Sequence, residues 1–240
     1  MSKIVIGNQK MYLNKDDVLE FVEMLKNTNM DNKKVIVCPT FPFLEYYNGV
    51  VEIGAQDVST NNNGAYTGQV SVAQLKSLNI SYCIVGHSER RQYNHETDDE
   101  INIKIKKLLA QNITPILCIG EKLEERENKS TETVIKKELT EDLKDLSPEL
   151  VEKIIISYEP IWAIGNGLTP TLEEIDQAMN FIKDYVTTTY HVKKTTVLYG
   201  GSVNDTNVDE LNTVASIDGF LIGTAASKPN AFQYVINSQN

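Results

Sequence analysis

Eight short runs of β-branched and other apolar residues recur along the chain, and they constrain the fold more than any other feature. Segments with helical spacing lie between most of them. Parallel strands need such crossovers, and eight strand–helix units that close on themselves form a (β/α)8 barrel of the α/β class. The expected strands are Ile4–Lys10, Val35–Pro39, Glu52–Asp57, Tyr82–His87, Pro115–Gly120, Ile154–Pro160, Thr196–Ser202 and Gly219–Thr224.

The helical segments carry apolar residues on one face. Glu173 to Thr187 shows this spacing, and Asp16 or Asp17 is expected to cap an earlier helix. The 240 residues suit one large domain, and no linker divides them, so residues 1–240 are expected to form a single barrel. We interpret the charged stretch Glu121–Lys129 as a solvated loop and helix start.

Charge and cysteine content exclude several classes of partner. A formal net charge of −10 argues against nucleic acid and anionic membrane surfaces. No long apolar stretch or signal-peptide pattern is present. Cys38, Cys83 and Cys118 lie in strand-like runs without metal-type spacing, which favours a reducing cytoplasm and apolar packing over disulfides or zinc. No metal or cofactor is expected.

Three polar residues stand where expected strands end, which in a barrel is the face that carries the site. His87 follows Ile84-Val85-Gly86 and precedes a segment that can open a helix, so the helix N-terminus would keep the imidazole neutral. Glu159 precedes an apolar, glycine-rich segment that includes Trp162, which suggests a lid over a candidate base. Lys10 follows Ile4-Val5-Ile6 and could supply positive charge.

Two glycine turns follow the last two expected strands. Gly200-Gly201 precedes Ser202, and Gly223 precedes Thr224. Glycine lets backbone N–H groups come close to a phosphate. The pair therefore predicts a phosphate site at the same face of the barrel.

The chain resembles the triosephosphate isomerase family from end to end. The resemblance implies a TIM barrel that interconverts dihydroxyacetone phosphate and D-glyceraldehyde 3-phosphate in glycolysis and gluconeogenesis, without cofactor or metal. The motifs that carry it are GNQKM at Gly7, CPTFPFL at Cys38, GAYTG at Gly64, IVGHSERR at Ile84, CIGEKLEER at Cys118, YEPIWAIG at Tyr158, YGGSV at Tyr199 and DGFLIGTA at Asp218.

The resemblance also implies residue roles. Glu159 would remove the proton next to the carbonyl, and His87 would polarise that carbonyl, as a neutral histidine is established to do in this family. Lys10 would stabilise the enediolate with the help of Asn8 and Glu89. Asn8, Lys10, Gly165, Ser202, Gly223 and Thr224 would bind substrate and its phosphate, and Ile164, Leu221, Trp162 and Tyr199 would form the clamp and lid.

Two loops are expected to have special tasks. A catalytic lid would lie near residues 160–170. A loop near residues 57–71 would project into a second copy of the chain, where Thr67 would touch Asn8 and Glu89 of the neighbour. The resemblance therefore implies a homodimer with Thr67, Gln69 and Arg90 at its interface.

The chain departs from the family pattern at several positions. Gln9 replaces a Trp, Thr224 a Gly, Asp57 an Asn and Gln69 a Glu, and Leu168-Thr169-Pro170 replaces the usual far hinge of the lid. Thr224 requires backbone dihedrals that suit a β-branched residue. None of these changes removes a catalytic group; they concern the lid and the dimer.

Two other functions remain compatible with a barrel of this kind. An aldolase-type lyase would use Lys10 as a Schiff base, which requires an uncharged amine. A binding barrel without activity would need no base beneath a lid. The set of Lys10, His87 and Glu159 favours the isomerase over both.

Overall fold

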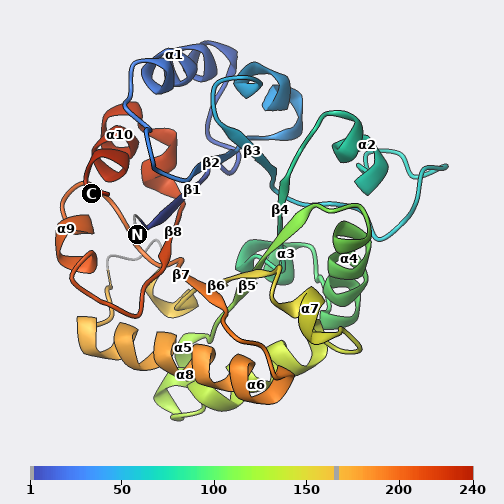
Figure 1. Cartoon of the computed structure of the whole chain (residues 1–240), viewed down its shortest axis with the longest axis vertical. Helices are drawn as coiled ribbons and strands as arrows, with labels where there is room; N and C mark the ends of the chain where they lie inside the picture. Colours follow the sequence, from blue (N-terminus) through green and yellow to red (C-terminus); the bar gives the residue numbers. More distant parts are fainter. Residues whose placement is uncertain (1–2, 165–167, 240) are drawn as a thin grey trace.

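The computed structural model describes residues 3–164 and 168–239, which form a closed barrel of eight parallel strands in sequential order (Figure 1). Each strand therefore pairs with the strands before and after it in the chain, and β8 closes on β1 through the pair Ile6 and Leu221. This confirms the predicted fold. The strands are β1 Ile4–Asn8, β2 Val35–Cys38, β3 Glu52–Ala55, β4 Tyr82–Val85, β5 Thr114–Ile119, β6 Ile155–Tyr158, β7 Thr196–Tyr199 and β8 Gly219–Ile222.

The strands alternate between two apolar cores. Ile6, Ile84 and Leu198 belong to the cluster inside the barrel, whereas their neighbours Val5 and Val85 pack outward beneath the helices. Side chains on a strand point alternately to its two faces, so both faces of each strand are buried. This explains why the strands read as unbroken apolar runs.

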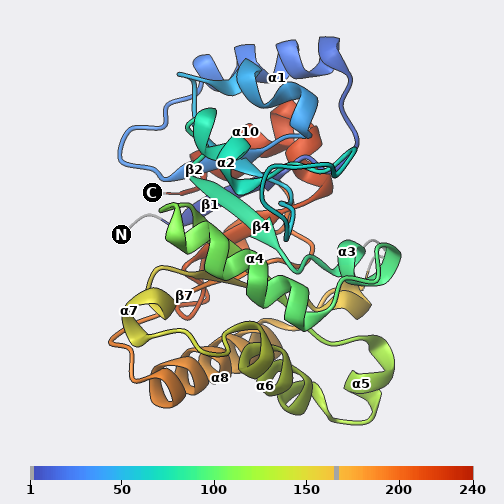
Figure 2. The same ribbon diagram turned by 90° about the vertical axis from the view of Figure 1, so that its right-hand side faces the viewer.

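Helices surround the barrel, and their lengths differ between the crossovers. Only a 3-10 helix, η1 Phe41–Tyr47, links β2 to β3, whereas α8 is the long crossover from β6 to β7. Figure 2 shows the two termini at one end of the barrel and α3 at the opposite end. The α-helices are α1 Lys15–Lys26, α2 Val72–Ser77, α3 Ser88–Tyr93, α4 Asp98–Ala110, α5 Leu123–Glu127, α6 Thr131–Asp142, α7 Pro148–Val151, α8 Leu172–Tyr190, α9 Val208–Leu211 and α10 Pro229–Asn237, and two further 3-10 helices are η2 Ile161–Ala163 and η3 Thr224–Ser227.

Two local predictions need correction. The expected strands ran a few residues too far at their C-terminal ends, because residues such as Lys10 and His87 continue the pattern but leave the sheet to form the site. The N-cap of the first helix lies two or three residues before the predicted caps, Asp16 or Asp17. Asn14 is its N-cap, and Asp17 completes a capping box by accepting the Asn14 N–H at 2.9 Å.

The loop between β3 and α2 extends away from the barrel (Figure 1, cyan). Its tip around Gly64 and Thr67 is exposed. Within the described part of the chain, none of the helices combines the length and apolar character needed to cross a bilayer.

Candidate active site

A cavity of about 270 Å³ opens at the C-terminal ends of the strands. The residues that line it follow β1, β4, β6, β7 and β8, so distant parts of the sequence meet there. A cavity in this position is where barrels of this kind place their sites. Among its lining residues are the predicted site residues Asn8, Lys10, His87, Glu159, Ile164, Ser202, Leu221, Gly223 and Thr224.

His87 is buried at the start of α3, where it is the N-cap residue. Its Nδ1 accepts a hydrogen bond from the Glu89 N–H at 3.2 Å. A nitrogen that accepts in this way carries no proton, so a neutral ring has its proton on Nε2. Nε2 lies 3.2 Å from Oε1 of Glu159 and can donate to an oxygen in the cavity.

Glu159 is also buried, one residue past β6. Its Oε2 accepts the Ser88 N–H at 3.2 Å, while Oε1 faces His87. The backbone here is packed tightly against β5: a Cβ on Gly120 would lie 1.7 Å from the Glu159 carbonyl oxygen. Only glycine fits at position 120, and its absence of a side chain lets the two strand ends approach and fix Glu159.

Lys10 lies in a turn just after β1, with a positive φ of 48°. Such a conformation is uncommon outside glycine and is typical of functional sites. Asn8 Oδ1 accepts the Lys10 N–H at 3.0 Å, and Gln56 Nε2 donates to the Lys10 carbonyl at 2.8 Å. The Lys10 amine lies 2.6 Å from Glu89 Oε1, and the two groups form an ion pair.

The two glycine turns form the wall of the cavity beside Lys10. A Cβ on Gly223 would lie 3.1 Å from Lys10 Cε, and one on Gly201 would lie 2.3 Å from the Tyr199 hydroxyl oxygen. Thr224 is the first residue of η3 and is not among the non-glycine residues with positive φ. Its backbone dihedrals therefore suit a β-branched side chain, which is the condition for a Thr at the position where the family has a Gly.

Of the residues expected at the clamp and lid, Ile164 and Leu221 line this cavity, whereas Trp162 and Tyr199 are not among the described residues that line it. Tyr199 is fully buried, and its hydroxyl has no hydrogen-bond partner within residues 3–164 and 168–239. Gly165, the remaining predicted phosphate contact, lies outside the described residues.

Glu121 is a site residue that sequence reasoning missed. Its side chain is fully buried, so the interpretation of residues 121–129 as a solvated loop and helix start is wrong for Glu121 alone; the rest of the stretch, which includes α5, is exposed or partly exposed. The Trp162 Nε1–H donates to Glu121 Oε1 at 2.8 Å, and the Tyr158 hydroxyl donates to the carboxylate at 3.1 Å. Arg126 lies 3.8 Å away. Burial raises the pKa of Glu121 above its usual value.

The residues expected at a dimer interface lie beside the projecting loop. Thr67 is exposed. Gln69 bonds within its own loop, where its Oε1 accepts from the Ser59 hydroxyl and, at 3.4 Å, from Asn61 Nδ2. The side chain of Gln69 thus already has partners in its own chain.

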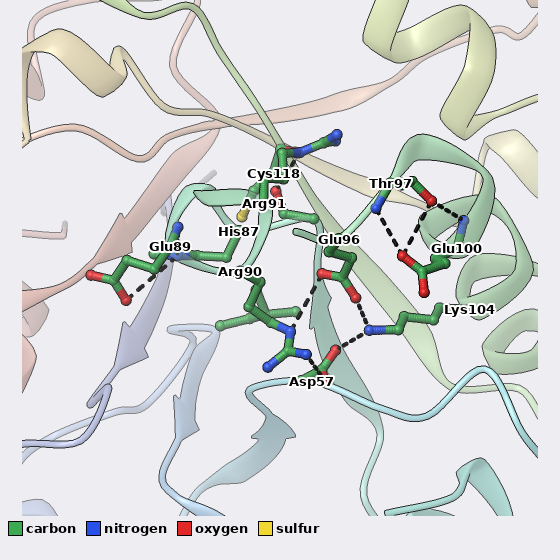
Figure 3. A network of polar contacts seen from close by, with 12 residues as sticks. Asp57, His87, Glu89, Arg90, Arg91, Glu96, Thr97, Glu100, Lys104 and Cys118 are labelled. Carbon is green, nitrogen blue, oxygen red and sulfur yellow. Dashed lines mark hydrogen bonds and ion pairs between the residues drawn. The ribbon is translucent and has the colours of Figure 1, made fainter. Parts of the chain in front are cut away.

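Arg90 is paired within the chain. Its guanidinium lies 2.9 Å from Asp57 and 3.4 Å from Glu96, and Lys104 binds both of these carboxylates. Figure 3 shows the four side chains as a closed ring, with Arg91 turned the other way, toward Cys118. Glu96 and Lys104 were not singled out in the sequence, since they lie on a connection and a helix whose surroundings only the fold reveals.

Comparison with known proteins agrees with these motifs and this geometry. The family described as "Triosephosphate isomerase" matches residues 3–239. Proteins named triosephosphate isomerase from Clostridium perfringens (strain SM101 / Type A) and Clostridium botulinum (strain Loch Maree / Type A3) are each 41% identical over 98% of this chain and 98% of their own. One from Dictyoglomus turgidum is 40% identical over 98% of this chain and 99% of its own. The chain therefore belongs to the triosephosphate isomerase family.

Proposed function

We propose that the chain interconverts dihydroxyacetone phosphate and D-glyceraldehyde 3-phosphate, with Glu159 and His87 as the groups that move the protons. The observation that carries the proposal is the 3.2 Å approach of the Glu159 carboxylate to His87 Nε2, in a cavity that Lys10 also lines. A base, a hydrogen-bond donor and a cation thus converge on one small space. The reaction is a shift of protons between neighbouring carbons and oxygens, so it needs no cofactor.

Proton transfer would proceed in two halves. The Glu159 carboxylate takes the proton from the carbon next to the substrate carbonyl, which leaves an enediolate, and returns it to the neighbouring carbon. His87 Nε2–H donates to the carbonyl oxygen as negative charge grows there and passes a proton between the two oxygens. The Nδ1 bond from Glu89 N–H supports this assignment, because it leaves Nε2 as the donor.

Lys10 would supply the charge that stabilises the enediolate. Its side chain is mostly shielded from water, and an ion pair acts more strongly where the dielectric is low. Asn8 would place Lys10 through the backbone bond at 3.0 Å, and Glu89 would hold the amine through the ion pair. An amine held in an ion pair disfavours the Schiff-base lyase, which requires a neutral nucleophile.

The substrate phosphate would bind to backbone N–H groups of Gly165, Ser202, Gly223 and Thr224. The glycine turns support this by leaving room for close approach. Residues 160–170 would form the lid, with Ile164 and Leu221 excluding water from Glu159 and with Trp162 anchored at Glu121. The Tyr199 hydroxyl, which has no hydrogen-bond partner among the described residues, supports a role with the lid, because a buried hydroxyl gains from a partner that closure could bring.

A coupled assay tests the proposed activity. The wild type, with a chelator present, should convert dihydroxyacetone phosphate into glyceraldehyde 3-phosphate. Absence of this conversion would contradict the proposal. Borohydride added with the substrate should leave Lys10 unmodified; a reduced adduct on Lys10 would instead identify the lyase.

We also infer a homodimer, located in the cytoplasm, in which the loop near residues 57–71 inserts into the partner. Exposed apolar side chains support it: Tyr66, on this loop, is 47% exposed, and Met11 and Tyr12, on the connection after β1, are 91% and 53% exposed. Large apolar side chains left exposed on a surface are typical of interfaces. Thr67 would then contact Asn8 and Glu89 of the partner, and Arg90 would lie at the rim.

Sedimentation over a dilution series tests the dimer. Gln69→Glu should lower its dissociation constant, because a carboxylate would replace a neutral amide near Arg90 of the partner. The pairing of Arg90 with Asp57 limits this gain, so Gln69→Glu in an Asp57→Asn background should strengthen the dimer more. A fully active monomer at micromolar concentration would contradict the dimer. Equal dissociation constants in all variants would contradict the proposed pair.

A further inference from the structure

The guanidinium of Arg91 is surrounded by three carboxylates behind the active site. Asp98 of α4 bonds its Nη1, Asp142 of α6 lies 2.7 Å from its Nη2, and Glu138 of α6 lies 3.9 Å from Nη1. The side chain of Asp142 is fully buried, and those of Arg91 and Glu138 are about 15% and 14% exposed. One cation thus faces three acids in a place with little water.

Such an imbalance cannot persist with all three acids ionised. Like charges in a poorly solvated cluster raise the pKa of at least one member until it holds a proton. Among the described residues, the charged groups that act on Glu138 besides Arg91 are acids: Asp98 of α4 and Glu125 of α5. The buried Cys118 thiol on β5 has a raised pKa and stays neutral. Burial raises the pKa of Glu138 to about 7, and that of Asp142 well above its usual value.

This cluster is attached to the backbone on both sides of the catalytic pair. Arg91 Nε donates to the carbonyl of Gly86, the residue before His87, at 2.8 Å. Glu138 Oε2 accepts the N–H of Gly120 at 2.9 Å. Gly120 packs against the Glu159 carbonyl with no room for a Cβ between them, so a change at Glu138 reaches Glu159 through one backbone contact.

We propose that Glu138 is a positioning residue for the reaction: its ionised carboxylate, placed beside Arg91, fixes Gly120 and thereby the backbone of Glu159. This rests on the proposed function, since it takes Glu159 as the base. A protonated carboxyl is a weaker acceptor for the Gly120 N–H than a carboxylate. Activity should therefore fall as the pH drops through about 7, beyond what the substrate phosphate alone causes.

Glu138→Gln separates this role from a purely structural one. The amide oxygen still accepts the Gly120 N–H, but it cannot titrate. The matched control is Glu132→Gln, an exposed glutamate on the same helix. We expect the ratio of kcat for Glu138→Gln to kcat for the wild type to rise by at least about threefold from pH about 8.5 to about 5.5, with KM unchanged, because small displacements of a catalytic group have large effects. The Glu132→Gln ratio should stay flat, since substrate ionisation cancels in it.

The Gly120 amide resonance provides a readout independent of activity. In the wild type its chemical shift should titrate near pH 7, and in Glu138→Gln it should not. A Gly120 shift that is flat in the wild type, or a kcat ratio that is flat with pH, would overturn the proposal. If Glu138→Gln does not fold, the pH titration of the Gly120 amide in the wild type still tests the proposal. An inactive wild type would defeat the proposed function, whereas the Gly120 titration would still decide whether Glu138 acts on Gly120.

Discussion

Two buried glutamates follow neighbouring strands and have different surroundings. Glu121, after β5, receives hydrogen bonds from the side chains of Tyr158 and Trp162 and lies near Arg126. Glu159, after β6, receives one backbone N–H and faces the imidazole of His87. Glu159 lines the cavity, whereas Glu121 is not among the described residues that line it.

The difference distinguishes a carboxylate held in place by side-chain donors from the one that we propose is the catalytic base. Side-chain donors on Tyr158 and Trp162 hold Glu121 in one place, beside η2. Glu159 accepts a backbone N–H from Ser88 and faces the imidazole of His87, the group that we propose exchanges protons with the substrate. A carboxylate open to a cavity beside a histidine can accept a proton from a substrate, whereas a carboxylate enclosed by donors cannot. Burial alone does not distinguish the two.

The largest expected effect is at Glu159. Glu159→Asp keeps the charge but withdraws the carboxylate by about one methylene, and a displacement on the order of 1 Å can cost roughly a hundredfold in rate. kcat should fall by about that factor and KM should change little, because the lost interaction belongs to the transition state. Steady-state kinetics measure this. A near-normal kcat for Glu159→Asp would contradict the assignment of Glu159 as the base. Glu121→Asp is the matched control.

A second effect concerns stability, and here the change at Glu121 should matter more than the change at Glu159. Glu121→Leu should lower the free energy of unfolding by about 1–3 kcal/mol, because buried donors on Tyr158 and Trp162 lose their acceptor. Glu159→Leu should lower it less, since a reactive carboxylate is placed for chemistry rather than for stability. Urea denaturation of the two variants compares them. A larger loss of unfolding free energy for Glu159→Leu than for Glu121→Leu would contradict the distinction between the two carboxylates.

Removing one donor of Glu121 should have a smaller effect. Trp162→Phe deletes the N–H that lies 2.8 Å from Oε1 and leaves Tyr158 and Arg126 in place. We expect a loss of about 0.5–1.5 kcal/mol in the free energy of unfolding. Trp162→Phe in a Glu121→Gln background should lower the free energy of unfolding by less than it does in the wild type. If the losses of the two single variants simply add up in the double variant, the bond between Trp162 and Glu121 contributes nothing.

The smallest effect is a pH dependence of stability. Because burial raises the pKa of Glu121 in the folded state, the folded chain binds this proton more tightly than the unfolded chain does. Glu121 therefore makes its full contribution to the free energy of unfolding below the usual glutamate pKa. This contribution is lost as the pH rises through the raised pKa of the folded state. Glu121→Gln should lack this decrease when unfolding is followed across acidic pH. An identical slope in the wild type and the variant would contradict the shift.

The sequence predicted the barrel and the positions of His87, Glu159 and Lys10, since both follow from local patterns: apolar runs for the strands and polar residues where the runs end. It did not predict the partners of Glu121, because these come from a later strand and its loop. The ring of Arg90, Asp57, Glu96 and Lys104 was missed for a similar reason. Charged side chains on a helix look solvated until packing shows which of them face inward.

Deuterium exchange tests the central claim most directly. Dihydroxyacetone phosphate is incubated in heavy water with the enzyme, and loss of the hydroxymethyl proton signal is followed by NMR. The wild type and Glu121→Gln should exchange this proton at rates within a few-fold of each other, and Glu159→Gln, an isosteric change that removes the base, should not exchange it. Exchange by Glu159→Gln at the wild-type rate would contradict the account.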